Sequence, residues 1–276
     1  MIRFFRKLRQ RLFKGNPPDQ AGRAGKFNKY LLYAIGEILL VVIGILIALQ
    51  VNNWNEYRAE RKQERVILHQ LKIEFTSNLD QLNGKIIGKE KLIRSVKRLF
   101  HYIDHPELAE KDSIDFHLGW TIPFTTFDPI ENDLASSGSL RLIRSDSLKL
   151  MLSLWTANIK EVQEDDLSWK WYRDNLYSPF LVEQYQLRNI RDMADKSGLW
   201  DRFLIGAGEE AKQNLNEGVG PSVHEVDVNR LLAHPDFEDH LERAISMNRF
   251  ALEQSLILRE RIREILEMVD AELARF

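Results

Sequence analysis

The 276-residue sequence contains no cysteine. This absence excludes a disulfide scaffold, a thiolate metal site, a cysteine nucleophile and a lipoprotein anchor. Glycine and proline are few, with 14 and 8 residues, so collagen-like and low-complexity classes are excluded as well. The net charge is only −2, because 39 Lys and Arg nearly balance 41 Asp and Glu. With 44% hydrophobic residues, a chain of this length can form a sizeable core.

Known catalytic motifs are also missing. The sequence has no Gly-x-Ser-x-Gly elbow, phosphate-binding loop, Rossmann glycine pattern or His-Glu-x-x-His motif. Gly218-Val-Gly220-Pro221 is too short to hold a phosphate. We therefore predict no catalytic residue, no cofactor site and no metal site, which favours a non-enzymatic protein.

Charge is distributed unevenly along the chain. Residues 1–30 hold nine basic residues and one acid, whereas residues 52–276 hold 30 basic and 39 acidic residues. Between them, residues 31–51 carry a single charge, Glu37, and 14 of these 21 residues are Leu, Ile or Val. As a helix this segment would be about 31 Å long, which matches the hydrocarbon core of a bilayer. We predict one transmembrane helix over 31–51.

The flanks of this helix predict its orientation. A cleaved signal peptide is the alternative, but the apolar run is too long and no small-x-small site follows it. We therefore expect a signal anchor, with the basic tail 1–30 in the cytoplasm and residues 52–276 outside it. Apolar residues alternate with basic ones in the tail, which predicts contact with an anionic bilayer surface by Arg3, Arg6, Lys7, Arg9 and Arg11. Nucleic-acid binding is not expected.

Glu37 is a functional candidate because a carboxylate inside a membrane helix is costly. On a helix it shares a face with Gly44 and Ala48, a small-xxx-small pair that lets two helices approach closely. We predict a helix–helix interface at Glu37, Gly44 and Ala48, most simply in a homo-oligomer. The alternative is that Glu37 extends to the headgroups without a specific role.

Apolar residues recur at steps of three and four in three long stretches of residues 52–276. They predict helices over about 54–104, 146–178 and 235–273, which must pack together as an elongated bundle. In the first stretch Glu90 fills a gap in the stripe. Between the helices we expect a loop with a short strand over 106–128, a short helix over 129–137, and a long loop over 195–235.

Two polar groups allow more than one interpretation. His101 and His105 share a helical face and could bind Zn²⁺ with Asp104 or His117, but a plain surface helix end is favoured. Asp166 lies near the apolar face of the second long helix. It is either a buried carboxylate of raised pKa, with or without a cation, or an acid at the edge of a solvated face; the pattern favours the solvated face.

Three segments carry a resemblance to a known family. Lys29–Glu56 (KYLLYAIGEILLVVIGILIALQVNNWNE), Phe4–Gln10 and Ser136–Leu148 resemble segments of a bacterial membrane family known only as domain of unknown function family 6090. The resemblance implies a single-pass envelope protein, in the inner membrane with its bulk in the periplasm. It implies no activity.

The expected fold class is mainly α, with one N-terminal transmembrane helix followed by an elongated helical bundle. The first functional hypothesis is an interaction or scaffold module that is anchored in the lipid bilayer and binds an envelope protein or a second copy of itself. A receptor-like ligand-binding bundle with a separate membrane partner is the second hypothesis. An envelope hydrolase comes last, because no acid/base cluster is evident.

Overall fold

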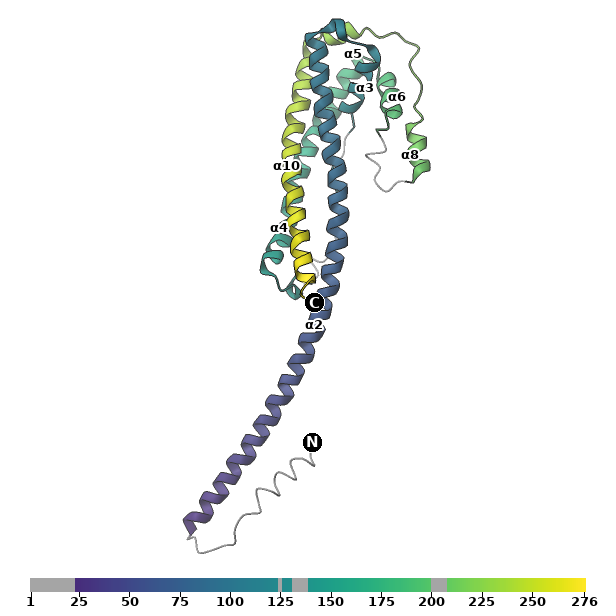
Figure 1. The fold of residues 1–276 in the computed structure, drawn as a ribbon. Coiled ribbons are helices and arrows are strands. Elements are labelled where there is room, and N and C mark those ends of the chain that lie inside the picture. Colours follow the sequence, from purple (N-terminus) through teal and green to yellow (C-terminus); the bar gives the residue numbers. More distant parts are fainter. Residues whose placement is uncertain (1–22, 124–125, 131–138, 200–207) are drawn as a thin grey trace. The chain divides into compact units, whose positions relative to one another are not determined.

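The fold was analysed in a computed structural model that describes residues 23–123, 126–130, 139–199 and 208–276. All regular elements in these ranges are helical, so the predicted fold class, mainly α with one long apolar N-terminal helix and a helical bundle, is confirmed. The chain divides into two compact units, residues 1–61 and 62–276. Helix α2 (Arg23–Asp104) contributes to both units (Figure 1).

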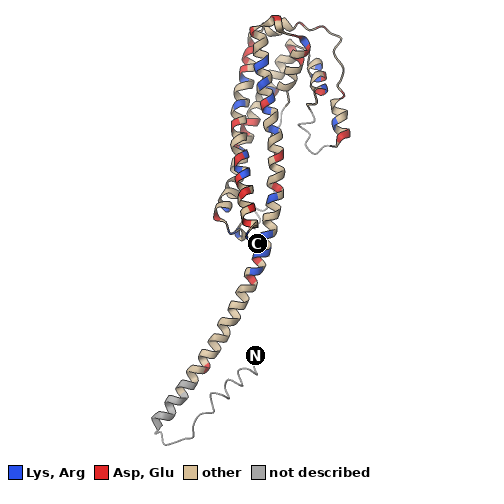
Figure 2. Cartoon of the chain, in the orientation of Figure 1, with Lys and Arg blue, Asp and Glu red and all other residues tan. Residues whose placement is uncertain are grey.

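The first unit is dominated by the apolar part of α2. Every leucine, isoleucine and valine between residues 31 and 51 whose side chain the structure describes is about half exposed, which is the pattern of a helix with no protein neighbour. Figure 2 shows that this stretch is almost free of charged side chains, in contrast to the second unit. An 18-residue window in this helix has a mean hydropathy of 2.6, and none of the residues in the window is buried. The helix is therefore long and apolar enough to cross a membrane.

The second unit is built on three long helices: the later part of α2, α4 (Asp146–Tyr172) and α10 (Pro235–Leu273). The bounds of α10 are those expected from its apolar period. On α4, the Ser145 hydroxyl accepts a hydrogen bond from the Leu148 N–H at 3.3 Å and so caps the helix start. Glu64 of α2 accepts a hydrogen bond from the Arg144 N–H at 2.8 Å and thereby ties the turn before α4 to the first helix.

Buried positions on α4 and α10 follow a strict repeat of four and three residues. On α4 they are residues 148, 152, 155, 159, 162, 166 and 169, and on α10 they run from 237 to 272 with the same steps. Ile245, Leu252 and Leu256 of α10 lie outside this repeat and are only partly buried. The mean step of 3.5 keeps one face of each helix against its neighbours, which a step of 3.6 would not.

The expected loop with a strand over 106–128 is wrong for most of its length. It contains a short 3₁₀ turn, η1 (Pro106–Leu108), and helix α3 (Lys111–Thr121). Ile114 and Leu118 are fully buried, one helical turn apart, while Phe116 between them is exposed. Residues 114–118 alternate between apolar and polar side chains, but this alternation belongs to one helical face rather than to a strand.

One further expectation fails after α4. The predicted helix 146–178 is interrupted by a π-helical turn, η3 (Arg173–Tyr177), before α5 (Ser178–Gln184). Pro179 lacks the N–H that would continue the α-helical ladder, and the wider turn shifts the buried face by one residue. Tyr177 is consequently buried, whereas Leu176 is exposed.

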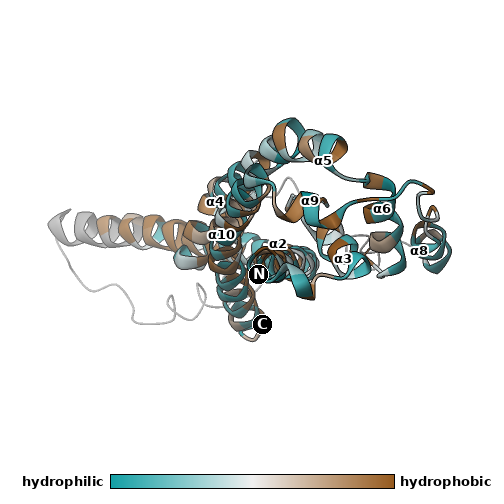
Figure 3. Cartoon of the chain, turned by 90° about the horizontal axis from the view of Figure 1, so that it is seen from above, coloured by the Kyte–Doolittle hydropathy of each residue, from teal (hydrophilic) through white to brown (hydrophobic). Residues whose placement is uncertain are grey.

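The remaining helices lie to one side of the three long ones, as Figure 3 shows from above. They are α6 (Leu187–Lys196), α8 (Glu209–Asn216) and α9 (Val228–Leu232), so the expected loop over 195–235 contains two short helices. A 3₁₀ turn, η2 (Ser139–Leu142), precedes α4. Of the short helix expected over 129–137, Pro129 and Ile130 are not helical and residues 131–137 lie outside the described part of the chain.

Candidate functional site

The predicted membrane-helix interface lies on the exposed apolar stretch of α2. Glu37, Gly44 and Ala48 are all exposed, and a Cβ added at Gly44 would meet nothing within 4 Å. This face is therefore unoccupied by any described part of the same chain, and the interface stays a prediction. The predicted surface contacts, Arg3, Arg6, Lys7, Arg9 and Arg11, lie outside the described residues.

A polar layer crosses the core of the second unit, formed by Lys89 of α2, Asp166 of α4 and Ser255 of α10. Lys89 Nζ lies 2.8 Å from Asp166 Oδ1 and donates a hydrogen bond to Ser255 Oγ at 3.0 Å. The Ser255 hydroxyl in turn donates to the Ala251 carbonyl at 2.7 Å. All three side chains are buried, so each long helix contributes one polar group to the same point of the core.

The electrostatics of this layer are set by burial. Burial raises the pKa of Asp166 and outweighs the attraction of Lys89, which acts in the opposite direction. Lys85, one turn before Lys89, has its pKa lowered by burial and by the Lys89 charge. Burial and the negative charge of Asp166 also raise the pKa of Asp165. The solvated-face interpretation of Asp166 is therefore wrong, and its cation is a side chain of the protein itself.

The polar layer separates two apolar clusters. One contains Phe75, Trp155 and Ile262, and the other contains Val96, Trp169 and Leu241. Sliding one helix by a turn would separate Lys89 from Asp166 and leave a buried charge without its partner. The layer therefore fixes the register of the three helices.

An extended segment, residues 126–130, packs against α2 and α4 beside this layer. Asn78 and Gln81 on α2 each exchange two hydrogen bonds with its backbone, at Ile130 and at Asp128 respectively. Phe127 is fully buried, with its ring 6.3 Å from that of Trp155. Side-chain amides thus replace the backbone partners that a strand would find in a sheet.

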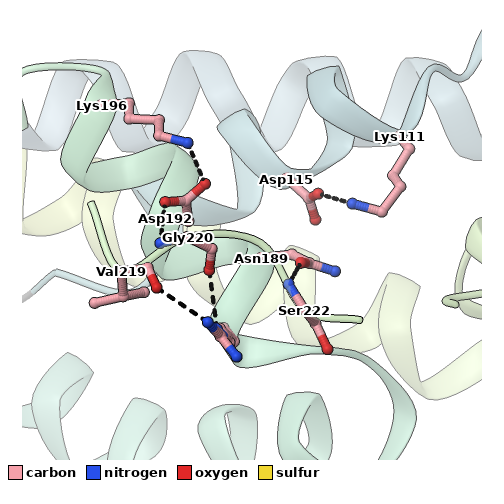
Figure 4. Close-up of polar contacts among 9 residues, drawn as sticks. Lys111, Asp115, Asn189, Asp192, Lys196, Val219, Gly220 and Ser222 are labelled. Carbon is pink, nitrogen blue, oxygen red and sulfur yellow. Dashed lines mark hydrogen bonds and ion pairs between the residues drawn. The ribbon is translucent and has the colours of Figure 1, made fainter. Parts of the chain in front are cut away.

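A second polar device clamps the loop 218–222 to helix α6 (Figure 4). Asp192 Oδ1 accepts a hydrogen bond from the Gly220 N–H at 2.7 Å, and Asn189 Oδ1 accepts one from the Ser222 N–H at 2.8 Å. Arg188 donates to the carbonyls of Val219 and Gly220 at 3.2 and 2.9 Å. We call these α6 side chains, together with Lys196, the α6 clamp.

The pKa of the clamp's aspartate, Asp192, shifts in the opposite direction to that of Asp166. Burial would raise the pKa of Asp192, but the hydrogen bonds from Lys196 Nζ at 2.6 Å and from the Gly220 N–H outweigh it, so this pKa is lowered. Gly218 and Gly220 have positive φ angles of 78° and 74°. A Cβ at Gly218 would lie 2.7 Å from Asp192 Oδ1, so the clamp requires glycine there.

Sequence reasoning missed most of these residues. Lys89, and not the expected Glu90, fills the gap in the α2 stripe, and the four–three repeat of buried positions would have indicated it. The α6 clamp has no comparable signal, because Asp192 and Gly220 lie 28 residues apart. The glycine-rich turn was noticed for phosphate binding and rejected, although its glycines have a structural role.

The histidine pair is not part of a metal cluster. The rings of His101 and His105 lie 4.9 Å apart, but no group of three or more potential metal ligands occurs among the described residues. An open concavity of about 790 Å³ lies nearby, where α2 ends and α10 begins, and is lined in part by Ile103, Leu232 and His234. It is shallow and bordered by exposed residues, including Glu107 and Glu238.

Fold and site together define a helical-bundle protein with one helix able to cross a membrane. The model of a family of unknown function (DUF6090) matches residues 37–111, so the resemblance to this family is confirmed over that segment. The match covers most of α2 and reaches the first residue of α3, whereas residues 4–10 and 136–148 lie outside it. No curated protein and no solved structure matches the chain.

Proposed function

We propose that this protein is a membrane-anchored, non-enzymatic interaction module whose bundle binds a protein partner. The observation that carries the proposal is the apolar stretch of α2, which is entirely exposed although it belongs to the same helix that enters the bundle. The segment 31–51 holds fourteen aliphatic residues, and the thirteen whose side chains are described are exposed. This composition favours a lipid environment strongly enough to offset one carboxylate.

The buried polar groups support an architectural role over a catalytic one. Lys89, Asp166 and Ser255 bond one another, and Asp192 bonds a backbone N–H and a lysine. These groups hold helices and a loop in place, and none of them lines the concavity at the end of α10. The strict four–three repeat of buried positions further supports coiled-coil packing of the long helices.

The location belongs to the same proposal. The excess of basic residues before the apolar helix supports an N-terminus in the cytoplasm, by the positive-inside rule. The protein would then be a single-pass protein of a bacterial inner membrane, with residues 52–276 in the periplasm. Helix pairing through Glu37, Gly44 and Ala48 would bring two copies together in the bilayer.

Two measurements test this proposal. In spheroplasts, a protease that cannot cross the inner membrane should degrade residues 52–276 and spare the N-terminal segment; a soluble, detergent-free chain would contradict the proposal.

Crosslinking and affinity purification of the full-length protein from membranes should recover a protein partner or a second copy. Glu37→Gln serves as the matched variant, because it keeps the size and removes the charge. If Glu37→Gln and Glu37→Leu both self-associate as the unchanged protein does, the predicted membrane interface is contradicted. If neither a protein partner nor a second copy is recovered, the proposed interaction function is contradicted.

A further inference from the structure

The loop held by the α6 clamp exposes an unusual row of apolar side chains. Val219 is 52% exposed, Val223 is 88% exposed, and Pro221 between them is exposed as well. Leu215, at the end of α8, is 38% exposed. We call Val219, Pro221 and Val223 the apolar row.

Alternate residues of this loop face opposite environments. The even positions, Gly220 and Ser222, direct their N–H groups to Asp192 and Asn189, whereas the odd positions carry the exposed apolar side chains. Figure 4 shows the loop backbone bonded in this way to side chains of α6. Single exposed valines are ordinary on protein surfaces, but here two buried polar side chains of α6 are used to keep the row in one conformation.

Such an arrangement lowers the cost of binding. A flexible loop loses conformational entropy when a partner orders it, whereas a loop fixed beforehand by the clamp and by two glycines of positive φ loses little. Because burial of the row in a partner would remove apolar surface from water, the row has the properties of a recognition surface.

The charge around the row indicates which class of partner fits. Residues 209–227 contain five acids, Glu209, Glu210, Glu217, Glu225 and Asp227, and one base, Lys212, which is paired with Glu209 at 3.1 Å. On α6, Lys196 and Arg191 are likewise paired with Asp192 and Asp195, and Arg188 donates to the loop carbonyls. With these residues included, seven acids face four bases, so acids still predominate. An anionic bilayer would repel this surface, whereas basic side chains around an apolar pocket would complement it.

We propose that the apolar row is the docking element of the bundle, and that its partner is a protein with an apolar pocket bordered by basic side chains. This inference rests on the proposed interaction function and assigns a place to it. The row supplies the apolar contact, and the surrounding acids supply orientation and specificity.

The test uses the full-length protein in its native membrane. A photoreactive amino acid at Val223 should give one discrete adduct with another protein, and the same amino acid at Val182, which is 62% exposed on α5, should not. The captured protein is then purified and its affinity for the detergent-solubilised chain is measured. Val219→Ser with Val223→Ser should weaken binding about tenfold or more, and added salt should weaken it further, whereas Val182→Ser should have no effect.

Several outcomes would overturn the inference. An adduct with phospholipid would assign the row to the bilayer, an adduct with a second copy would assign it to self-association, and no adduct would remove the docking role. Unchanged affinity of the double serine variant would do the same even if a protein had been captured. If that partner still co-purifies with the variant, the proposed function stands and only the assignment to this loop fails.

Discussion

The polar layer and the α6 clamp each depend on one buried aspartate, yet the two carboxyls behave oppositely. At Asp166 burial outweighs the Lys89 ammonium group and a backbone hydrogen bond from Phe127, and its pKa is raised, whereas at Asp192 the hydrogen bonds from Lys196 and the Gly220 N–H outweigh burial, and its pKa is lowered. In the clamp, hydrogen bonds and a neighbouring charge offset the cost of burying the ionised carboxylate of Asp192. In the layer, they offset only part of that cost for Asp166. The comparison teaches that the layer specifies an arrangement of helices at some cost in stability, while the clamp stabilises one loop outright.

The largest effect is expected from breaking the layer on one side. Lys89→Met leaves Asp166 in the core without a cation, and we expect a loss of about 3–5 kcal/mol in the free energy of unfolding, measured by urea titration of tryptophan fluorescence. Lys97→Met, at an exposed position of the same helix, is the control. The double variant Lys89→Met with Asp166→Leu should recover most of the loss. If it is no more stable than the single variant, the layer is not acting as an ion pair.

A smaller effect is expected from the clamp. Gly218→Ala places a Cβ against Asp192 and forces alanine to a φ near 78°, which we expect to cost about 1–3 kcal/mol. Gly208→Ala is the matched control, because its φ is −64° and a Cβ there meets nothing within 4 Å. Hydrogen exchange of the Gly220 and Ser222 amides should accelerate in the first variant only. Equal protection in both variants would show that the clamp does not hold the loop.

The two devices also differ in how far sequence could predict them. The three long helices follow from apolar periodicity. Asp166 was placed near the apolar face because it falls in that period, but the acids beside it led to the wrong preference for a solvated position. Lys89 was missed because a cation at a buried position reads as an irregularity in the stripe. The clamp joins α6 to a loop through backbone atoms of Gly220 and Ser222, and a backbone contact leaves no pattern of residue types. The π turn before Pro179 was missed for a different reason. A proline permits either a kink or a helix end, so the sequence alone does not decide between them.

Within the layer, Ser255 should contribute least. Ser255→Ala removes the hydroxyl that accepts from Lys89 Nζ but keeps the ion pair with Asp166, so we expect a loss of about 1 kcal/mol. The same urea titration measures it, with Ser246→Ala on the exposed face of α10 as the control. A loss as large as that of Lys89→Met would mean that the hydroxyl, and not the carboxylate, holds the lysine.

The subtlest consequence of the comparison is an opposite dependence on pH. A raised pKa in the folded state means that Asp166 favours folding most below the ordinary aspartate pKa, and that this contribution declines as the pH rises through the raised value. A lowered pKa means that Asp192 favours folding above the ordinary value, and that its contribution is lost as the pH falls through the lowered one. The free energy of unfolding, followed against pH, should therefore lose part of its acid-side decline in Asp192→Asn. In Asp166→Asn it should instead lose part of the decline on the other side, as the pH rises above the ordinary aspartate pKa. The NMR resonances of the two side-chain carboxyl carbons should titrate at different pH values, that of Asp166 at the higher pH. The reverse order would contradict the assignment of burial as the dominant influence on the pKa of Asp166.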